Sequence, residues 1–180
     1  MSISIGDVIP KFNLPNANKA LGGDYVNSND YIKENGLIVV FECNHCPYVI
    51  ASIERMNQLS KYANSNSIGF LGINSNDAEV YASDSFENMV KRADKGMPYP
   101  YLFDESQEIA HKFGAKRTPE FFLFNSNQEL VYSGRMDDSP RDPNQVTTNE
   151  LKDAIDCLLD GEKPKIEFTE SIGCSVKWKV

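Results

Sequence analysis

The chain has 180 residues, of which 41% are hydrophobic and 24% are charged, and its formal net charge is -8. This length predicts one domain, residues 1–180, with a core of its own. An acidic chain without a block of basic residues argues against nucleic acid and anionic membranes as partners. The segment Met1–Pro10 lacks the basic start and apolar centre of a signal peptide, and no apolar run reaches the roughly 18 residues of a membrane span. We therefore expect a cytoplasmic protein.

The first half of the chain predicts a strand, a helix and a second strand. Residues 1–36 are rich in Gly, Pro, Asn and Asp, which favours an N-terminal extension of short strands and turns. The apolar run Leu37–Glu42 is typical of a central strand that is buried on both faces. Helical spacing of apolar residues follows from Pro47 to about Ala63, and Gly69–Ile73 is a second apolar run. This order predicts a parallel βαβ unit with a right-handed crossover.

The second half predicts a helix, a short extended segment, a second helix, two strands and a last helix. In chain order these are Ser83–Lys95, Tyr101–Phe103, Ser106–Phe113, Glu120–Phe124, Glu129–Ser133 and a helix from Thr148 or Asn149 to Gly161. The helices in the middle of the chain indicate a helical insertion. Residues 162–180 are predicted to be an irregular C-terminal tail. The fold class is therefore α/β, with a central mixed sheet that is parallel first and ends in an antiparallel hairpin.

The motif Cys43-Asn44-His45-Cys46 lies where the first buried strand ends and the helix begins. The free N–H groups and the positive dipole end of that helix favour a thiolate at Cys43, which is the attacking species in disulfide exchange. Cys46 lies one turn further on, where it can attack a mixed disulfide. We therefore predict Cys43 as an exposed nucleophile, Cys46 as the resolving thiol and Cys43–Cys46 as a redox-active disulfide.

Three neighbours of the two cysteines could act on the dithiol, and two of them, His45 and Glu42, have a second interpretation. His45 as an imidazolium would stabilise the thiolate and make the disulfide a stronger oxidant, or it is a solvated residue at a helix start. Asn44, the other intervening residue, is placed to tune exchange and is assigned to substrate binding. Glu42 could relay protons or raise the pKa of Cys43 by repulsion, or it faces outward at the end of the strand.

The other cysteines argue against a metal site. Zinc takes four ligands, commonly as two close pairs, and no second pair accompanies Cys43 and Cys46, so we expect no metal and no other cofactor. Four cysteines are also too few and too unevenly spread for a disulfide scaffold. Cys157 lies beside the apolar face of the last helix and reads as a buried filler. Cys174, in the tail, is either a third redox thiol or a free structural cysteine.

These residues resemble the thioredoxin fold. The Cys-x-x-Cys after a core strand resembles its active site, and Thr118-Pro119, before the strand that starts at Glu120, resembles its cis-proline loop, which faces the dithiol and shapes the substrate-binding surface. On its own, a proline there could also be a simple loop-to-strand boundary. A closer resemblance is to an uncharacterised redoxin subfamily, described as thioredoxin-family or AhpC/TSA-like (alkyl hydroperoxide reductase and thiol-specific antioxidant). Its pattern is recognisable in Cys43–Val49, Ser75–Ala78, Tyr101–Gln107, Thr118–Phe122, Gly134–Asp138 and Gly173–Trp178.

Two departures from the family patterns bear on the chemistry. A peroxiredoxin nucleophile is preceded three residues earlier by Thr or Ser, and here that residue is Val40, which argues against peroxidase activity. Thioredoxins have a buried Asp six residues before the first cysteine, and here that residue is Leu37. The proton acceptor for Cys46 must then be another group, with Glu42, Glu120 or water as candidates.

The sequence therefore predicts a single thioredoxin-like domain that acts as a thiol–disulfide oxidoreductase through a mixed disulfide. One alternative is a peroxiredoxin-like thiol peroxidase with an antioxidant role, in which Cys43 is oxidised to sulfenic acid. Another is a metal-binding or redox-sensing module. The expected partners are protein or small-molecule disulfides and thiols with a reductase system, and the expected assembly is a monomer or weak dimer.

Overall fold

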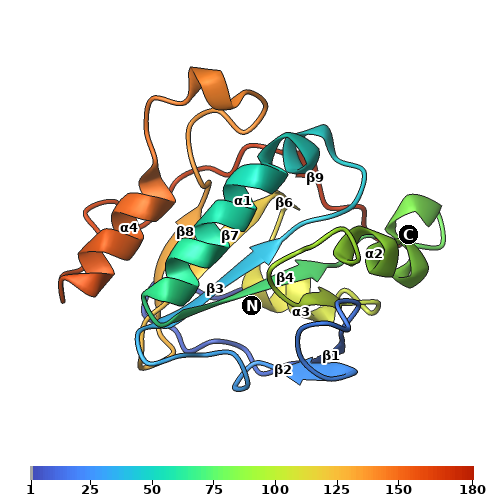
Figure 1. Cartoon of the computed structure of the whole chain (residues 1–180), viewed down its shortest axis with the longest axis horizontal. Coiled ribbons are helices and arrows are strands. Elements are labelled where there is room, and N and C mark those ends of the chain that lie inside the picture. The colour runs from blue at the N-terminus through green and yellow to red at the C-terminus, as the bar shows by residue number, and fades with distance from the viewer. Residues whose placement is uncertain (1) are drawn as a thin grey trace.

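The structure is a computed structural model that describes residues 2–180. Its centre is a five-stranded sheet in the order β5-β4-β3-β7-β8 (Figure 1). Strands β3, β4 and β5 are parallel, whereas β7 is antiparallel to both β3 and β8. The strand bounds are β3 Gly36–Phe41, β4 Ile68–Asn74, β5 Tyr101–Phe103, β7 Glu120–Phe124 and β8 Leu130–Gly134. The predicted mixed sheet, parallel first and antiparallel at its end, is confirmed.

Strand β3 is buried on both faces, because its side chains alternate between two apolar cores. Ile38 and Val40 belong to one core, and Leu37, Val39 and Phe41 belong to the other. Helix α1 crosses the first face in Figure 1, and residues of α2 and α4 complete that core. Helix α3 and the N-terminal extension cover the second face. The helix bounds are α1 Pro47–Ser65, α2 Phe86–Ala93, α3 Glu108–Phe113 and α4 Glu150–Leu159, with 3-10 turns η1 Ala82–Asp84 and η2 Pro143–Gln145.

The N-terminal extension forms a small sheet of its own. Strand β1, Asn13–Pro15, pairs antiparallel with β2, Tyr25–Asn27. The predicted short strands and turns are confirmed there. None of the helices within residues 2–180 has the length and apolar character that crossing a bilayer requires.

Two helix starts differ from the prediction. Helix α2 begins only after Ser85, whose side chain accepts a hydrogen bond from the backbone N–H of Asn88 and so caps the helix. Helix α3 begins two residues late. Gln107 adopts a positive φ of 66°, and the carboxylate of Asp104 accepts the first free N–H groups, including that of Ala110 at 2.9 Å. In both places a side-chain cap fixes a boundary that apolar spacing does not define.

The C-terminal tail is not irregular throughout, so that prediction is wrong in part. Strand β9, Cys174–Ser175, pairs antiparallel with β6, Arg117–Thr118, and places Cys174 opposite Thr118. The approach is so close that a Cβ atom at Gly173 would lie 2.0 Å from the carbonyl oxygen of Thr118. Glycine is therefore required at residue 173 for this pairing. Figure 1 shows β9 beside β6, close to the start of α1.

Candidate active site

The two cysteines of the motif lie together between β3 and α1. Cys43 follows Glu42 at the end of β3, and Cys46 is the N-cap of α1, with Pro47 as its first residue. Both are free thiols, and their residues are only 1% and 0% exposed. The prediction of an exposed Cys43 is therefore wrong.

The loop before β7 covers both sulfurs. The Sγ atom of Cys43 lies 3.5 Å from Oγ1 of Thr118, and the thiol of Cys46 donates to the carbonyl oxygen of Thr118, also at 3.5 Å. The Thr118–Pro119 peptide bond is cis. The cis-proline loop that the resemblance implied is confirmed, and it faces the dithiol.

The two thiols of the motif are in hydrogen-bond contact, and this contact dominates their acidity. The hydrogen bond with Cys43 lowers the pKa of Cys46 to about 4, although burial opposes the shift. The same hydrogen bond, together with burial, raises the pKa of Cys43. The pair therefore loses its first proton easily and holds its second proton strongly. In the resting geometry the charge lies on Cys46, at the helix start, and not on Cys43 as the sequence predicted.

A buried carboxylate lies within 4.8 Å of the Cys43 sulfur. Asp84, in η1, is fully buried, and its Oδ2 atom lies 2.6 Å from Nδ1 of His45. Its Oδ1 atom accepts from the backbone N–H of Asn44 at 2.7 Å. The charge of Asp84 adds to the raised pKa of Cys43, after the larger effects of Cys46 and burial. The contact with Asp84 ties His45 to the site, so His45 is not freely solvated.

Asn44 is held by its side chain as well as by its backbone. Its Oδ1 atom accepts from the hydroxyl of Tyr101 at 2.7 Å, and its amide donates to the carbonyl oxygen of Ser83 at 2.9 Å. These contacts fix the turn between the two cysteines. The structure shows Asn44 as a residue that positions the turn, while its predicted role in substrate binding stays a prediction.

Glu42 forms a buried charge cluster next to Cys43. Its side chain is fully buried; Oε1 lies 2.5 Å from a guanidinium nitrogen of Arg92, and Oε2 accepts from the hydroxyl of Tyr99 at 2.7 Å. Arg92 also donates to the backbone carbonyl of Cys43 at 3.1 Å. The outward-facing interpretation of Glu42 is therefore wrong. Within residues 2–180 no hydrogen bond joins Glu42 to either sulfur, so its effect on the dithiol passes through Arg92.

Neither the residue at position 37 nor the carboxylate of Glu120 is placed to accept the proton of Cys46. Leu37 packs in the core on the opposite face of the sheet from the cysteines. The carboxylate of Glu120 accepts from the backbone N–H groups of Lys116 and Arg117 and from the hydroxyl of Ser171. Glu120 thus links the loop before β7 to the C-terminal tail. The Cys43 thiol is the group with the largest effect on the pKa of Cys46.

Three of these groups could also hold a metal ion. Ligand atoms of Cys43, His45 and Asp84 lie within 4.8 Å of one another. Zinc requires a fourth ligand in a structural site, and this group supplies three. The sequence argument against a metal did not foresee Asp84, so metal analysis of protein purified without chelator is a necessary control.

Comparison with known proteins identifies the family. The redoxin family model matches residues 4–155. The chain belongs to the redoxin family. No curated protein matches it.

Solved structures similar to this redoxin carry the same fold. An uncharacterised conserved protein from Geobacillus kaustophilus is 38% identical, with 98% of this chain and 93% of that chain covered and a TM-score of 0.90. A hypothetical protein from Sinorhizobium meliloti 1021 is 32% identical, with 100% and 97% covered and a TM-score of 0.89. A candidate thiol:disulfide interchange protein, DsbE, from Chlorobium tepidum is 20% identical, with 73% and 85% covered and a TM-score of 0.59. The predicted thioredoxin-like fold is confirmed, and family membership supports an oxidoreductase that acts through thiols.

Several residues of this redoxin site were not predicted from its sequence. Asp84, Arg92, Tyr99 and Tyr101 all come from the middle of the chain, where apolar spacing predicted only helices and an extended segment. Only Arg92 has a signal in the sequence, because it is a charged residue on the apolar side of a predicted helix. Cys157 is half-buried rather than buried, so its interpretation as a filler is wrong.

Proposed function

We propose that this redoxin is a thiol–disulfide oxidoreductase that uses the dithiol of Cys43 and Cys46. The supporting observation is that two free thiols lie together beneath the cis-proline loop, where Thr118 contacts both sulfurs. Substrates in this proposal are disulfide-bonded proteins or small disulfides in the cytoplasm, and a thiol reductase system regenerates the dithiol.

The reaction begins with the shared proton. When it moves from Cys43 to Cys46, Cys43 becomes the thiolate, and the hydroxyl of Thr118 can donate to it; this contact favours a lower pKa for Cys43. The thiolate attacks a substrate disulfide, one substrate sulfur leaves as a thiolate, and a mixed disulfide forms. Cys46 then passes its proton to the first substrate thiolate and attacks Sγ of Cys43, which releases the second substrate sulfur as a thiolate. The substrate disulfide gains two electrons, and the two cysteines lose two electrons as the Cys43–Cys46 disulfide forms.

Burial of the dithiol adds one condition to this mechanism. A substrate disulfide reaches Cys43, which is 1% exposed, only after local opening of the covering segments. The β6–β9 pair spans two residues on each strand, so opening there disrupts few backbone hydrogen bonds. Exchange is therefore expected to be gated by local opening rather than by thiolate chemistry alone.

Trapping of mixed disulfides tests the proposal directly. A Cys46→Ser variant retains the attacking thiol but lacks the resolving one, so it should accumulate disulfide-linked partners through Cys43. Non-reducing electrophoresis and mass spectrometry of captured complexes are the measurement. The Cys43→Ser/Cys46→Ser double variant is the control and should capture none. Absence of covalent partners on Cys46→Ser, under conditions where the protein is folded, contradicts the proposal.

Thiol peroxidase is a second candidate because one observation favours it. The hydroxyl that Val40 lacks is supplied near the sulfur by Thr118, 3.5 Å from Cys43. Peroxide consumption with a reducing system separates the two functions. Slow consumption that differs little between wild type and Thr118→Val is the expected result, and rapid, saturable consumption that needs both Cys43 and Thr118 would place peroxidase first.

His45 is expected to set the redox potential. Replacing it with Ala leaves the buried charge of Asp84 uncompensated beside the sulfur, which destabilises the thiolate and favours the disulfide. The midpoint should become more reducing by about 30 mV, a tenfold change in the equilibrium constant. Equilibration with glutathione buffers measures it, with Lys61→Ala on the exposed side of α1 as the control. The wild-type midpoint should also be more oxidising than that of a Cys-Gly-Pro-Cys thioredoxin. An unchanged midpoint in His45→Ala removes His45 from the mechanism.

A further inference from the structure

The C-terminal tail brings a third thiol to the dithiol. Strand β9 pairs with β6 and sets Cys174 opposite Thr118, the residue whose carbonyl accepts from Cys46. Cys174 also packs against the core cluster that contains Cys43 and Cys46. Its thiol is in side-chain hydrogen-bond contact with Cys46. Cys46 therefore has one thiol partner on its own loop and a second on the tail.

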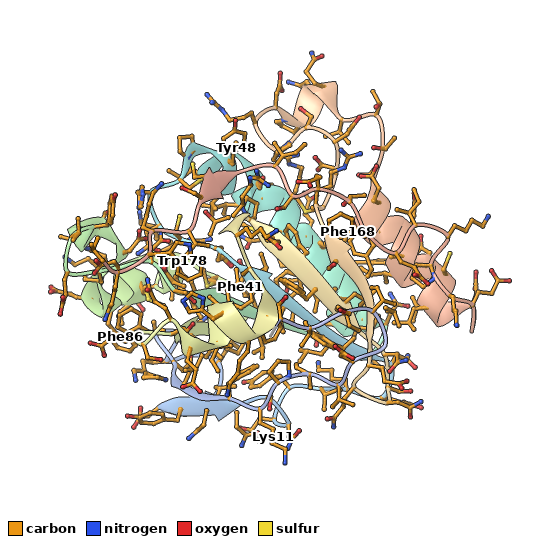
Figure 2. All side chains as sticks on the ribbon, turned by 180° about the vertical axis from the view of Figure 1, so that it is seen from behind. Lys11, Phe41, Tyr48, Phe86, Phe168 and Trp178 are labelled. Atoms are coloured by element: carbon orange, nitrogen blue, oxygen red, sulfur yellow. The ribbon has the colours of Figure 1, made fainter. Side chains whose placement is uncertain are left out.

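The tail is fastened on both sides of Cys174. Before it, the hydroxyl of Ser171 donates to Glu120 at 3.1 Å. After it, the backbone N–H of Val176 donates to the carbonyl of Lys116 at 2.9 Å, and Trp178 stacks on His111 with ring centroids 4.3 Å apart. Figure 2 shows β9 beside the start of α1, where Tyr48 is labelled, with Trp178 further along the tail. In the closed state, contacts on both sides of Cys174 therefore hold it near Cys46.

We propose that Cys174 is a third redox thiol that exchanges with the oxidised dithiol at Cys46. This proposal rests on the proposed function, since the Cys43–Cys46 disulfide is its starting state. The Cys174 sulfur attacks Sγ of Cys46, the bond between Cys43 and Cys46 breaks, and a Cys46–Cys174 disulfide forms. The proton of Cys174 passes to the released Cys43 sulfur. No net oxidation occurs, so the step needs no further oxidant or reductant.

Cys46 is the sulfur that Cys174 attacks because Cys174 pairs opposite Thr118, whose carbonyl accepts from Cys46. Cys46, and not Cys43, is also the cysteine that shifts the pKa of Cys174. Burial, followed by the contact with Cys46, raises the pKa of Cys174 to about 11, so the thiol keeps its proton until exchange. In the product, a disulfide joins Cys46 to Cys174 of the tail, and Cys43 is a free thiol.

Disulfide mapping of the full chain tests the exchange. Trypsin leaves Cys43 and Cys46 together in peptide 34–55 and Cys174 in peptide 166–177. After oxidation with oxidised glutathione, acid quenching and alkylation, wild type should yield a linked pair of these peptides with Cys43 alkylated. In Cys43→Ser, glutathione first binds Cys46 covalently and Cys174 then displaces it, so the linked pair should become the main product.

Two variants separate the tail from the thiol chemistry. Cys174→Ser should lose the linked pair, and the matched control Cys157→Ser should keep it at the wild-type level. Gly173→Ala keeps every cysteine but pushes the tail from Thr118, so the linked pair should fall several-fold relative to wild type. Circular dichroism confirms that each variant is folded.

The outcomes distinguish this inference from the proposed function. If Cys43→Ser yields only Cys46 bound to glutathione, with Cys174 alkylated, the inference fails while disulfide exchange through Cys43 can still be measured in wild type. If the linked pair forms yet Cys43→Ser reduces disulfides at the wild-type rate, the proposed function fails instead. A linked pair that requires Cys46 and Cys174 but not Cys157 supports the inference.

Discussion

Replacement of Cys43 with Ser is expected to lower the rate of disulfide reduction by at least about a thousandfold, because a hydroxyl cannot replace the attacking thiolate. Cys46→Ser should differ in kind. It retains the first step and releases one substrate thiol per protein, but it does not turn over, because no second sulfur resolves the mixed disulfide. Single-turnover and multiple-turnover assays with a small disulfide measure both variants, and Cys157→Ser on α4 should match wild type.

The opposite pattern would reverse the roles of the two cysteines. The hydrogen bond from Cys43 lowers the pKa of Cys46 to about 4, so Cys46 carries the charge in the closed state. If Cys46→Ser loses the first step and Cys43→Ser keeps it, then Cys46 attacks directly and the proton transfer between the sulfurs has no role. Because Cys46 has the lower pKa of the two thiols, direct attack by Cys46 is a concrete alternative, and observing it would contradict the proposed mechanism.

The sheet and the motif could be predicted because the information is local. The alternation of Ile38 and Val40 with Leu37 and Val39 encodes a strand buried on both faces, and a cysteine pair at its end follows from counting residues. Asp84 could not be predicted, because its proximity to His45 depends on how η1 packs against the motif loop. A buried carboxylate is recognisable only once its partners are placed in space.

The exposure of Cys43 was misjudged for a related reason. A helix start is usually accessible, and the sequence gives no sign that Thr118 and the tail close over it. Strand β9 has two residues and pairs with a strand more than fifty residues earlier, so neither propensity nor periodicity indicates it. Its close approach depends on Gly173, where a glycine in a polar tail reads only as a turn.

The ion pair between Arg92 and Glu42 is expected to dominate the stability of the site. Replacing Arg92 with Met leaves the fully buried carboxylate of Glu42 without its partner, and such a change typically costs about 3–5 kcal/mol. Burial is the largest single effect on the pKa of Arg92 and lowers it, but Glu42, Tyr101 and Tyr99 together outweigh burial and raise the pKa. Urea unfolding at neutral pH measures the free energy of unfolding.

The adjacent Lys91 provides the matched control. It pairs with Glu87 on the exposed side of the same helix at 3.6 Å, and such pairs contribute only about 0.3–0.5 kcal/mol, so Lys91→Ala should hardly change the free energy of unfolding. The double variant Arg92→Met/Glu42→Gln should recover part of the loss, because the neutral amide no longer needs a cation and can still accept from Tyr99. A loss in Arg92→Met no larger than in Lys91→Ala would contradict a dominant role of this ion pair in stability. The same variants also lack the hydrogen bond from Arg92 to the carbonyl of Cys43. Stability recovered in the double variant without recovery of exchange would therefore assign Arg92 a second role in positioning the nucleophile.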